Sequence, residues 1–349
     1  MRLQQSRGYR VVRIGIVGAG ANTRSRHIPG FQAIEGVTLT GVCNRSRESS
    51  QAAADAFGIE RVFDTWEALV ESDDVDAICI GTWPYMHHPI TLRALAAGKH
   101  VLTEARMAMN LAEAREMYAA AEASDKVAMI VPAPFYLKYE ATVLQMVADG
   151  VFGDWLDIHV RGLGGAYAPD APLAWRQRRD LSGNNVMSMG IMNETVRRYA
   201  GHEASVMASG KIFTTERTDA ETGERRAADV PESLGIVAEL ESGATAVYHF
   251  STVAAGGDNG AIEMYGTKGA VRYADSACQV RLDGGDWAAL EVEPGREGGW
   301  RVEEDFIDSI RDGAPVTHTS FADGVRYMEF TEAVRQSLVE GRRIELPLE

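Results

Sequence analysis

The chain has 349 residues, of which 45% are hydrophobic and 24% charged, the composition of a globular protein too long for one ordinary core. We therefore expect two domains. The formal net charge of −15 and the sequence pI of about 5.1 argue against nucleic acid and against an anionic membrane as partners.

The cysteines and the first residues favour a cytoplasmic location. Cys43, Cys79 and Cys278 stand singly in strand-like segments, with no metal-binding spacing and no disulfide framework. The opening sequence MRLQQSRGYR is polar and lacks the apolar core of a signal peptide, and no apolar run is long enough to span a bilayer. We expect a reducing cytoplasm, no metal and no membrane partner.

A β-branched run at residues 11–17 predicts the first strand, and a glycine-rich turn follows it. Gly18 and Gly20 hold the first two places of G-x-G-x-x-G, and Thr23 holds the third. Bare glycine backbone lets a phosphate approach, and the following helix offers free N–H groups to a pyrophosphate. A second strand at residues 37–43 follows at the expected distance, so the pattern indicates a dinucleotide-binding turn rather than an ordinary strand–turn–helix.

The second strand is followed by Asn44, Arg45, Ser46 and Arg47. An NAD-preferring site usually has Asp or Glu here to bind the adenosine ribose hydroxyls. No carboxylate in this segment repels a 2′-phosphate, and two guanidinium groups attract one. The segment therefore favours NADP over NAD, unless both arginines are only solvated surface.

Strand and helix alternate over the N-terminal part of the chain. Further strands are expected at residues 77–81, 100–102 and 127–131, with helices at 50–57, at 90–97 and from the Asn110 cap to Ala123. This alternation predicts an α/β fold with a doubly wound, parallel Rossmann sheet in a domain of residues 1–131.

The pattern changes after Trp155, where strands have few helices between them. Such strands are expected at residues 156–161, 205–213, 234–240, 245–252 and 261–265. They indicate a mainly antiparallel sheet in a second domain, residues 132–349. The polar connection at 214–231 is interpreted as a mobile loop. Helices are expected at 302–311 and 327–340, the last packing back toward the Rossmann domain.

The segment DVDAICIGTWPYMHHPITLRALAAGKHVLTEARMAMNLAEA resembles the Gfo/Idh/MocA family, which includes glucose–fructose oxidoreductase and inositol dehydrogenase. The resemblance extends to His27, to the pair Trp175 and Arg176, to residues 183–201 and to FIDSIRDGAPV. It implies a Rossmann domain followed by an α/β domain with an open, mainly antiparallel sheet. It also implies NAD(P), a sugar or polyol substrate oxidised or reduced at a carbinol carbon, and pairing of subunits as a homodimer or homotetramer.

The chain departs from the family at the residues that usually carry the chemistry. The family usually reads Glu-Lys-Pro where this chain has Glu104, Ala105 and Arg106, so the substrate-anchoring lysine is replaced by alanine. The family's aspartate and histidine base correspond to Ser188 and Met192. Because a carbinol carbon gives up hydride only if its hydroxyl proton also leaves, another group must move the proton, or the chemistry differs or is absent.

Three side chains are candidate catalytic residues, each with a structural alternative. Arg106 could hold a carboxylate or stabilise an alkoxide, or form a structural salt bridge. Tyr136 could exchange a proton if its pKa is lowered, or pack at the domain junction. Glu194 could be a base, or pair on the surface with Arg197 and Arg198.

The remaining candidates concern binding. Asn184 and Asn185 could bind substrate hydroxyls or make the turn after Gly183, and Met192 takes the substrate-side position of the family histidine. His87 is kept at a family cofactor-side position but could instead be a packing residue. The expected cofactor-binding residues are Gly18, Gly20, Ala21, Asn22, Asn44, Arg45, Thr82, Trp83, His87, Glu104, Trp175 and Arg176.

These features predict an NAD(P)-dependent oxidoreductase that acts on a sugar-like or polyol molecule with an atypical proton relay. One alternative is a nucleotide-dependent glycosidase that uses transient oxidation and elimination, with no net change in the cofactor. The other is a non-catalytic NAD(P)-binding sensor or partner subunit.

Overall fold

The computed structural model describes residues 11–257, 259–274 and 276–349, so the polar start of the chain lies outside the described residues. Two compact units divide the chain. The first comprises the residues up to Ala108, Ala112–Pro132 and Arg301–Gly324; the second comprises Met109–Leu111, Ala133–Trp300 and Val325–Glu349. A single boundary at residue 131 does not describe this interleaving, because residues 301–324 return to the first unit.

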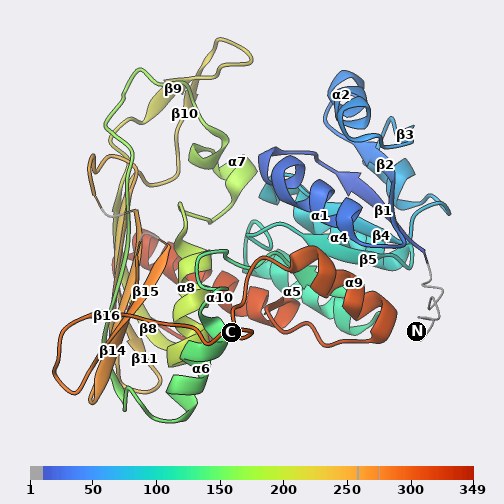
Figure 1. Ribbon diagram of the computed structural model, residues 1–349. Helices are drawn as coiled ribbons and strands as arrows, with labels where there is room; N and C mark the ends of the chain where they lie inside the picture. The colour runs from blue at the N-terminus through green and yellow to red at the C-terminus, as the bar shows by residue number, and fades with distance from the viewer. Residues whose placement is uncertain (1–10, 258, 275) are drawn as a thin grey trace, which may run out of the picture. The chain divides into compact units, whose positions relative to one another are not determined.

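The first unit is built on a seven-stranded sheet in the order β17-β6-β5-β4-β1-β2-β3. Neighbouring strands run parallel except β17, which pairs antiparallel with β6. Helices flank the sheet (Figure 1), so a central strand such as β4 is a fully buried apolar run, AICI. The parallel Rossmann sheet is confirmed. Its strands are β1 (Val12–Val17), β2 (Val37–Cys43), β3 (Arg61–Val62), β4 (Ala77–Ile80), β5 (His100–Thr103), β6 (Ala128–Ile130) and β17 (Thr319–Ser320).

Local capping sets the limits of helices in this unit. Helix α2 (Arg47–Phe57) begins where the Ser46 hydroxyl accepts the Ser49 N–H, and it ends at Gly58, whose φ is 66°. Helix α9 (Val302–Asp312) packs against α1 (Ile28–Ala33), where the Phe306 and Phe31 rings meet edge to face at 6.4 Å. The other helical segments are η1 (Thr23–His27, a π-helix), α3 (Trp66–Val70), η2 (Pro84–Met86), α4 (His87–Ala96) and α5 (Leu111–Glu122).

The second unit holds a nine-stranded sheet in the order β16-β15-β14-β13-β7-β12-β11-β8-β18. All neighbours run antiparallel except β7 and β12, which confirms the mainly antiparallel sheet. The strands are β7 (Trp155–Leu163), β8 (Glu203–Lys211), β11 (Ser233–Leu240), β12 (Thr245–Ser251), β13 (Asn259–Gly266), β14 (Gly269–Ala274), β15 (Ala277–Leu282), β16 (Ala288–Ala289) and β18 (Ile344–Glu345).

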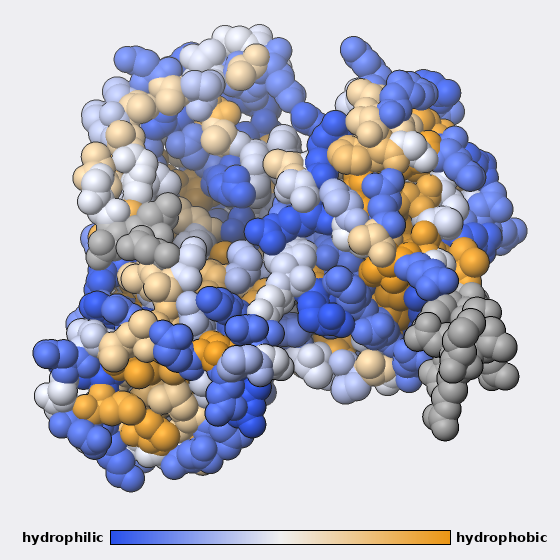
Figure 2. Space-filling view, viewed as in Figure 1, coloured by the Kyte–Doolittle hydropathy of each residue, from blue (hydrophilic) through white to orange (hydrophobic). Residues whose placement is uncertain are grey.

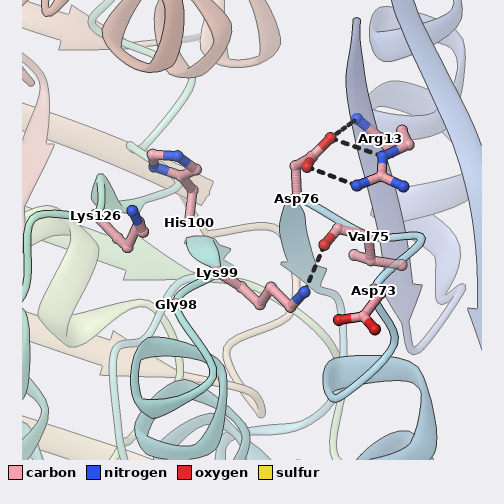
Figure 3. Close-up of a pocket in the computed structure, with 8 residues that line it drawn as sticks. All are labelled: Arg13, Asp73, Val75, Asp76, Gly98, Lys99, His100 and Lys126. Carbon is pink, nitrogen blue, oxygen red and sulfur yellow. Dashed lines mark hydrogen bonds and ion pairs between the residues drawn. The ribbon is translucent and has the colours of Figure 1, made fainter.

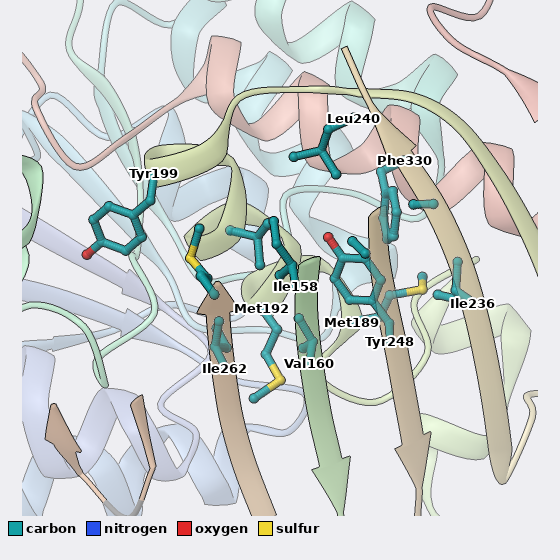
Figure 4. Close-up of a cluster of buried hydrophobic side chains, with 14 of the residues drawn as sticks. Ile158, Val160, Met189, Met192, Tyr199, Ile236, Leu240, Tyr248, Ile262 and Phe330 are labelled. Atoms are coloured by element: carbon teal, nitrogen blue, oxygen red, sulfur yellow. The ribbon is translucent and has the colours of Figure 1, made fainter. Parts of the chain in front are cut away.

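One face of this sheet forms the core of the second unit. Helix α8 (Met189–Ala200) places Met189 and Met192 among strand residues such as Ile158 and Tyr248 (Figure 4). Helices α6 (Glu140–Ala148) and α10 (Phe321–Glu340) also contribute buried side chains. Alternate strand residues point to the other face, where large apolar side chains are exposed. On β8, β11 and β12 these are Met207, Val237 and Val247, which lie opposite one another on neighbouring strands.

Residues 214–231 are more ordered than the sequence indicates. Strands β9 (Glu216–Thr218) and β10 (Arg225–Ala227) pair as an antiparallel hairpin. Arg217 is buried, and its guanidinium donates to Oε1 of Glu232 at 2.7 Å and to the Ala168 carbonyl oxygen at 2.7 Å. These contacts anchor a segment whose polar composition predicts a mobile loop. Two short segments precede it, η3 (Trp175–Gln177) and α7 (Arg179–Ser182).

The molecular surface agrees with the charged composition. In the view of Figure 2, hydrophilic residues are interspersed with smaller apolar groups. Within the described part of the chain, no helix has the length and apolar character needed to cross a membrane.

Candidate functional site

The glycine turn lies at the carboxyl end of β1. Gly18 has a φ of 86°, and a Cβ there would lie 2.8 Å from the backbone nitrogen of Thr82. The Thr23 hydroxyl donates to the Gly18 carbonyl oxygen at 3.2 Å, and it lies so close to Gly81 that a Cβ at that residue would collide with it. The turn therefore presses against the end of β4, and side chains are excluded where the two segments meet.

A cleft of about 590 Å³ opens beside this turn, at the carboxyl ends of β1, β2 and β4. This is the edge at which doubly wound sheets bind ligands, and the volume lies within the usual range for a small-molecule site. Six of the residues expected to bind cofactor line it: Gly18, Gly20, Asn44, Arg45, Thr82 and Trp83. The geometry therefore fits an elongated ligand with phosphate groups, as the G-x-G pattern predicts.

Asn44 fastens the turn to the helix beside it. Its side-chain oxygen accepts the Ala19 N–H at 2.7 Å, and its amide nitrogen donates to the Ser49 carbonyl oxygen at 2.8 Å. Both polar atoms of the side chain thus have partners within the protein. Asn44 replaces the usual ribose-binding carboxylate, and in this structure it positions the turn.

The end of the cleft beside Arg45 carries charges of both signs. The guanidinium of Arg45 lies over the Trp83 ring, 4.8 Å from its centroid. Asp64, from the connection between β3 and α3, and Glu67, from the first turn of α3, line the same cleft, and Arg47 forms an ion pair with Asp64. Sequence reasoning missed these two carboxylates because they lie outside the glycine motif and the strand that follows it. Their only signal was their place directly after a very short strand.

A buried charged cluster lies next to the turn. His27 is fully buried; its Nε2 lies 3.1 Å from Oε1 of Glu104, and its Nδ1 faces Glu303. Burial opposes protonation of His27, but the hydrogen bonds to Glu104 and Glu303 outweigh it and raise the pKa of His27 to about 9. The pKa of Glu104 is lowered: burial would raise it, but the hydrogen bond from His27 prevails. Asn22 Nδ2 donates to Glu104 Oε1 at 2.5 Å.

His87 ties two segments of the same sheet edge together. It is fully buried on α4; its Nδ1 lies 2.8 Å from the Arg106 carbonyl oxygen and its Nε2 lies 3.0 Å from that of Thr82. Burial lowers the pKa of His87, so the ring is neutral near physiological pH. Arg106 itself is 7% exposed, and the peptide bond between Ala105 and Arg106 is cis.

In the second unit, the other two candidate catalytic residues belong to one buried cluster. The Tyr136 hydroxyl donates to Oε1 of Glu194 at 3.3 Å, and the Arg198 guanidinium lies over the Tyr136 ring and pairs with Glu140. Burial and then the Glu194 charge raise the pKa of Tyr136 well above its ordinary value, which is the opposite of what proton transfer near neutral pH needs. Glu194 pairs with Arg198 at 3.9 Å, but at 4% exposure it lies inside the unit rather than on the surface.

The expected substrate-binding residues also have internal partners. Asn184 accepts a hydrogen bond from Arg179 at 2.9 Å and donates one to Glu332 at 2.7 Å. Asn185 is buried and donates to the Ser182 carbonyl oxygen at 2.7 Å. These contacts favour the interpretation that both asparagines shape the turn.

Met192, which the family resemblance predicts to correspond to a histidine, has a buried apolar side chain. It belongs to the core cluster in Figure 4, and the Ser188 hydroxyl lies 3.6 Å from its sulfur. Trp175 and Arg176 lie on η3, with the guanidinium 4.2 Å from the indole centroid.

A second cavity, of about 140 Å³, lies at the amino ends of β1, β4 and β5 (Figure 3). There the Arg13 guanidinium donates a hydrogen bond to Oδ1 of Asp76 at 2.9 Å. The Lys99 ammonium donates to the carbonyl oxygens of Ser72 and Val75 at 2.8 and 2.7 Å. These contacts hold the α3–β4 connection to the sheet, so this cavity has a structural role. Across the part of the chain that is described, no group of His, Cys, Asp and Glu could hold a metal ion.

Comparison with known families agrees with both units. Residues 12–131 match the model of the oxidoreductase family with an NAD-binding Rossmann fold, and residues 141–272 match the GFO/IDH/MocA C-terminal domain. A solved structure of levoglucosan dehydrogenase in complex with NADH and L-sorbose superposes with a TM-score of 0.86 at 21% identity, covering 96% of this chain and 99% of that one. That likeness shows a shared fold.

Curated relatives are similar over different lengths. A dTDP-3,4-didehydro-2,6-dideoxy-alpha-D-glucose 3-reductase from Streptomyces violaceoruber is 35% identical over 186 residues, so this chain spans 52% of its length. A myo-inositol 2-dehydrogenase from Thermotoga maritima is 24% identical over 348 residues, 96% of this chain and 98% of that protein. A glycosyl hydrolase family 109 protein from Shewanella baltica is 30% identical over 155 residues, 42% of this chain and 34% of that protein.

Proposed function

Because the chain belongs to the Gfo/Idh/MocA family of NAD-binding oxidoreductases, we propose that it oxidises or reduces a carbinol or carbonyl carbon of a sugar-like or polyol molecule. The observation that carries the proposal is the cleft beside Gly18, where bare backbone meets the end of β4. A bound nicotinamide dinucleotide would supply the hydride acceptor or donor. Gly18, Gly20, Ala21 and Asn22 would face its pyrophosphate, and Arg45 and Trp83 its adenosine half.

We propose NADP as the preferred dinucleotide. Arg45 supports this choice because its guanidinium lines the cleft, directly after the position of the usual ribose-binding carboxylate. Asp64 and Glu67 oppose it, although the Arg47 ion pair offsets the charge of Asp64. The preference is therefore expected to be modest.

The proton relay is atypical in this proposal. Ala105 and Met192 have no titratable group, and Tyr136 and Glu194 are held in a buried cluster with Arg198. Arg106 is thus the first candidate for contact with substrate, where a guanidinium stabilises a developing alkoxide or holds a carboxylate. By resemblance to the family, Trp175 and Arg176 would lie near the nicotinamide.

The test is direct. Purified protein is titrated calorimetrically with NADPH and NADH, then assayed with a panel of sugars and polyols while the absorbance of the reduced nicotinamide is followed. Binding together with substrate-dependent change in absorbance supports the proposal. Binding without turnover on any substrate favours the non-catalytic alternative.

A second candidate function is nucleotide-dependent glycoside cleavage. The similarity of one segment to a glycosyl hydrolase family 109 protein favours it, although that match spans only 34% of the relative. It predicts release of free sugar from a glycoside with no net change in nicotinamide absorbance. Dependence of that release on added dinucleotide would separate it from contamination by an ordinary glycosidase.

We also propose a homodimer or homotetramer, as the family resemblance implies. The exposed side chains of Met207, Val237 and Val247, which are cross-strand neighbours on the nine-stranded sheet, support it, since exposed apolar patches favour association. Light scattering in solution would measure the mass directly.

A further inference from the structure

A series of hydrogen-bonding side chains links helix α9 to the glycine turn. Glu303, the second residue of α9, faces Nδ1 of His27. Nε2 of His27 lies 3.1 Å from Oε1 of Glu104, and the same oxygen accepts from Nδ2 of Asn22 at 2.5 Å. Asn22 follows Gly20 by two residues, so the series ends in the first turn of the helix after the glycines.

The interior members of this series are buried. His27 is 0% exposed and Glu303 is 1% exposed. Burying a charged group costs free energy unless the group is paired. The pairing of His27 with two carboxylates is therefore part of the folded core rather than a contact of surface side chains. Gly30 supports that interpretation, because a Cβ there would lie 2.8 Å from the side chain of Glu303. A glycine in α1 leaves the space through which the Glu303 side chain reaches His27.

The geometry also fixes the charge of His27. Both ring nitrogens face carboxylate oxygens, which only accept hydrogen bonds, so the ring donates to both as an imidazolium. Two neighbouring groups change charge in other pH ranges. Burial and the carboxylates raise the pKa of Cys79 on β4 well above its ordinary value, and burial lowers the pKa of His87 on α4. Within this cluster, His27 is the group whose charge changes at a pH of about 9.

We propose that Glu303 is a positioning residue for dinucleotide binding: through His27 and Glu104 it fixes the orientation of Asn22 and of the helix turn after Gly20. The inference rests on the proposed function, because it takes the glycine turn to be where the dinucleotide binds. A helix encoded near the C-terminal end of the chain thereby sets the geometry of a motif near its beginning.

Removing the carboxylate charge has two measurable consequences. In Glu303→Gln, the amide oxygen still accepts from His27, but the imidazolium loses one of its two anionic partners. We expect NADPH to bind about tenfold more weakly, because a neutral amide holds the imidazolium less strongly than a carboxylate does. We also expect binding to fall at a lower pH than in the wild type, because the imidazolium gives up its proton more easily.

The experiment measures NADPH affinity from neutral pH to above the pKa of His27, for the wild type, Glu303→Gln and Asp308→Asn. Asp308 is an exposed carboxylate on the same helix, paired with Arg301 at 3.6 Å, and serves as the matched control. Thermal unfolding of each variant is recorded in parallel. A merely structural role for Glu303 would lower the unfolding temperature and leave the pH profile of binding unchanged.

The outcomes are distinct. Weaker binding and a downward shift of the pH profile in Glu303→Gln, with Asp308→Asn like the wild type, support the inference. Wild-type affinity and profile in Glu303→Gln overturn it. If Glu303→Gln does not fold, histidine NMR of the wild type decides: binding that persists unchanged while His27 loses its proton overturns the inference. A wild type that binds neither NADPH nor NADH overturns the proposed function itself.

Discussion

The glycine turn of the first unit and helix α8 of the second unit are predicted to serve different steps, and their sequence patterns depend on different atoms. At the turn, backbone geometry carries the pattern: a left-handed Gly18 and a close approach to Thr82. At α8, side chains carry it, and the family resemblance predicts that Ser188 and Met192 correspond to an aspartate and a histidine. We therefore expect dinucleotide binding and proton transfer to be separable in this chain, because the first depends on bare backbone and the second on titratable groups.

The buried side chains of α8 pack in the core of the second unit or contact neighbouring side chains. Met192 and Met189 are 4% and 0% exposed and belong to the sheet-facing core. Glu194, two residues after Met192, contacts Tyr136 and Arg198. Helix α8 is thus mainly a packing element of the second unit, whereas the glycine turn borders an open cleft.

The strongest test of this contrast is Gly18→Ala. The new methyl group would meet the Thr82 nitrogen at 2.8 Å, and alanine disfavours a φ of 86°. We expect dinucleotide affinity to fall about a hundredfold, or about 2.7 kcal/mol, measured by calorimetry.

Gly58→Ala is the matched control for this change. Gly58 has a φ of 66°, but nothing lies within 4 Å of its Cβ position, so the variant carries the backbone strain without the collision. Its affinity should match that of the wild type. Equal losses in both variants would mean that general destabilisation, rather than the turn, controls binding.

The second test restores the family side chains in Ala105→Lys combined with Met192→His. An imidazole among core side chains should lower the free energy of unfolding by about 2 kcal/mol, measured by denaturant titration. Met192→Leu is the control, because it conserves volume and should cost less than about 1.5 kcal/mol. A gain of polyol oxidation in the double variant would identify a degenerate dehydrogenase; a loss of the native activity would indicate a replacement relay.

The third test separates the two kinds of candidate catalytic residue. Arg106→Ala should lower turnover at least about tenfold, because it removes the guanidinium proposed to stabilise the developing alkoxide. Tyr136→Phe should cost less turnover, because burial holds the tyrosine in its neutral form. Arg106→Lys keeps the charge without the fork and should lie between wild type and alanine. Wild-type turnover in Arg106→Ala would move attention to Glu194 and to Asn184 and Asn185.

Most of the fold was predictable because its signals are local. Buried β-branched runs predicted the central strands, and the glycine-rich segment predicted the tight turn between the first strand and the helix after it. Strands β3 and β17 were not predicted, because a strand of two residues is too short to show alternation of apolar and polar residues. The hairpin of β9 and β10 was also missed, since a distant partner, Glu232, holds its buried Arg217 in place.

The site was predictable only where neighbouring residues form it. Glu303 lies 276 positions from His27, so no short motif joins them. One signal was available: a glutamate adjoins Val302 and precedes Phe306 on the buried face of an otherwise amphipathic helix. Tyr136 and Glu194 have side chains of types suited to catalysis, but in the structure they are buried and contact each other. Their residue types alone did not indicate this packing role.

The smallest expected effect concerns the choice of dinucleotide. It tests whether the charged residues beside the glycine turn determine the preference for NADPH or NADH. Arg45→Ala should weaken NADPH more than NADH, by about twofold to fivefold, since an exposed charge contact contributes up to about 1 kcal/mol. Asp64→Asn should act in the opposite direction, because it removes a carboxylate from the cleft and releases Arg47 from its ion pair. Added salt should reduce both differences, as screening acts on exposed charges. Calorimetric titration of both dinucleotides measures all three effects; equal affinities in the wild type, or an NADH preference that Arg45→Ala leaves untouched, would contradict the proposed role of Arg45.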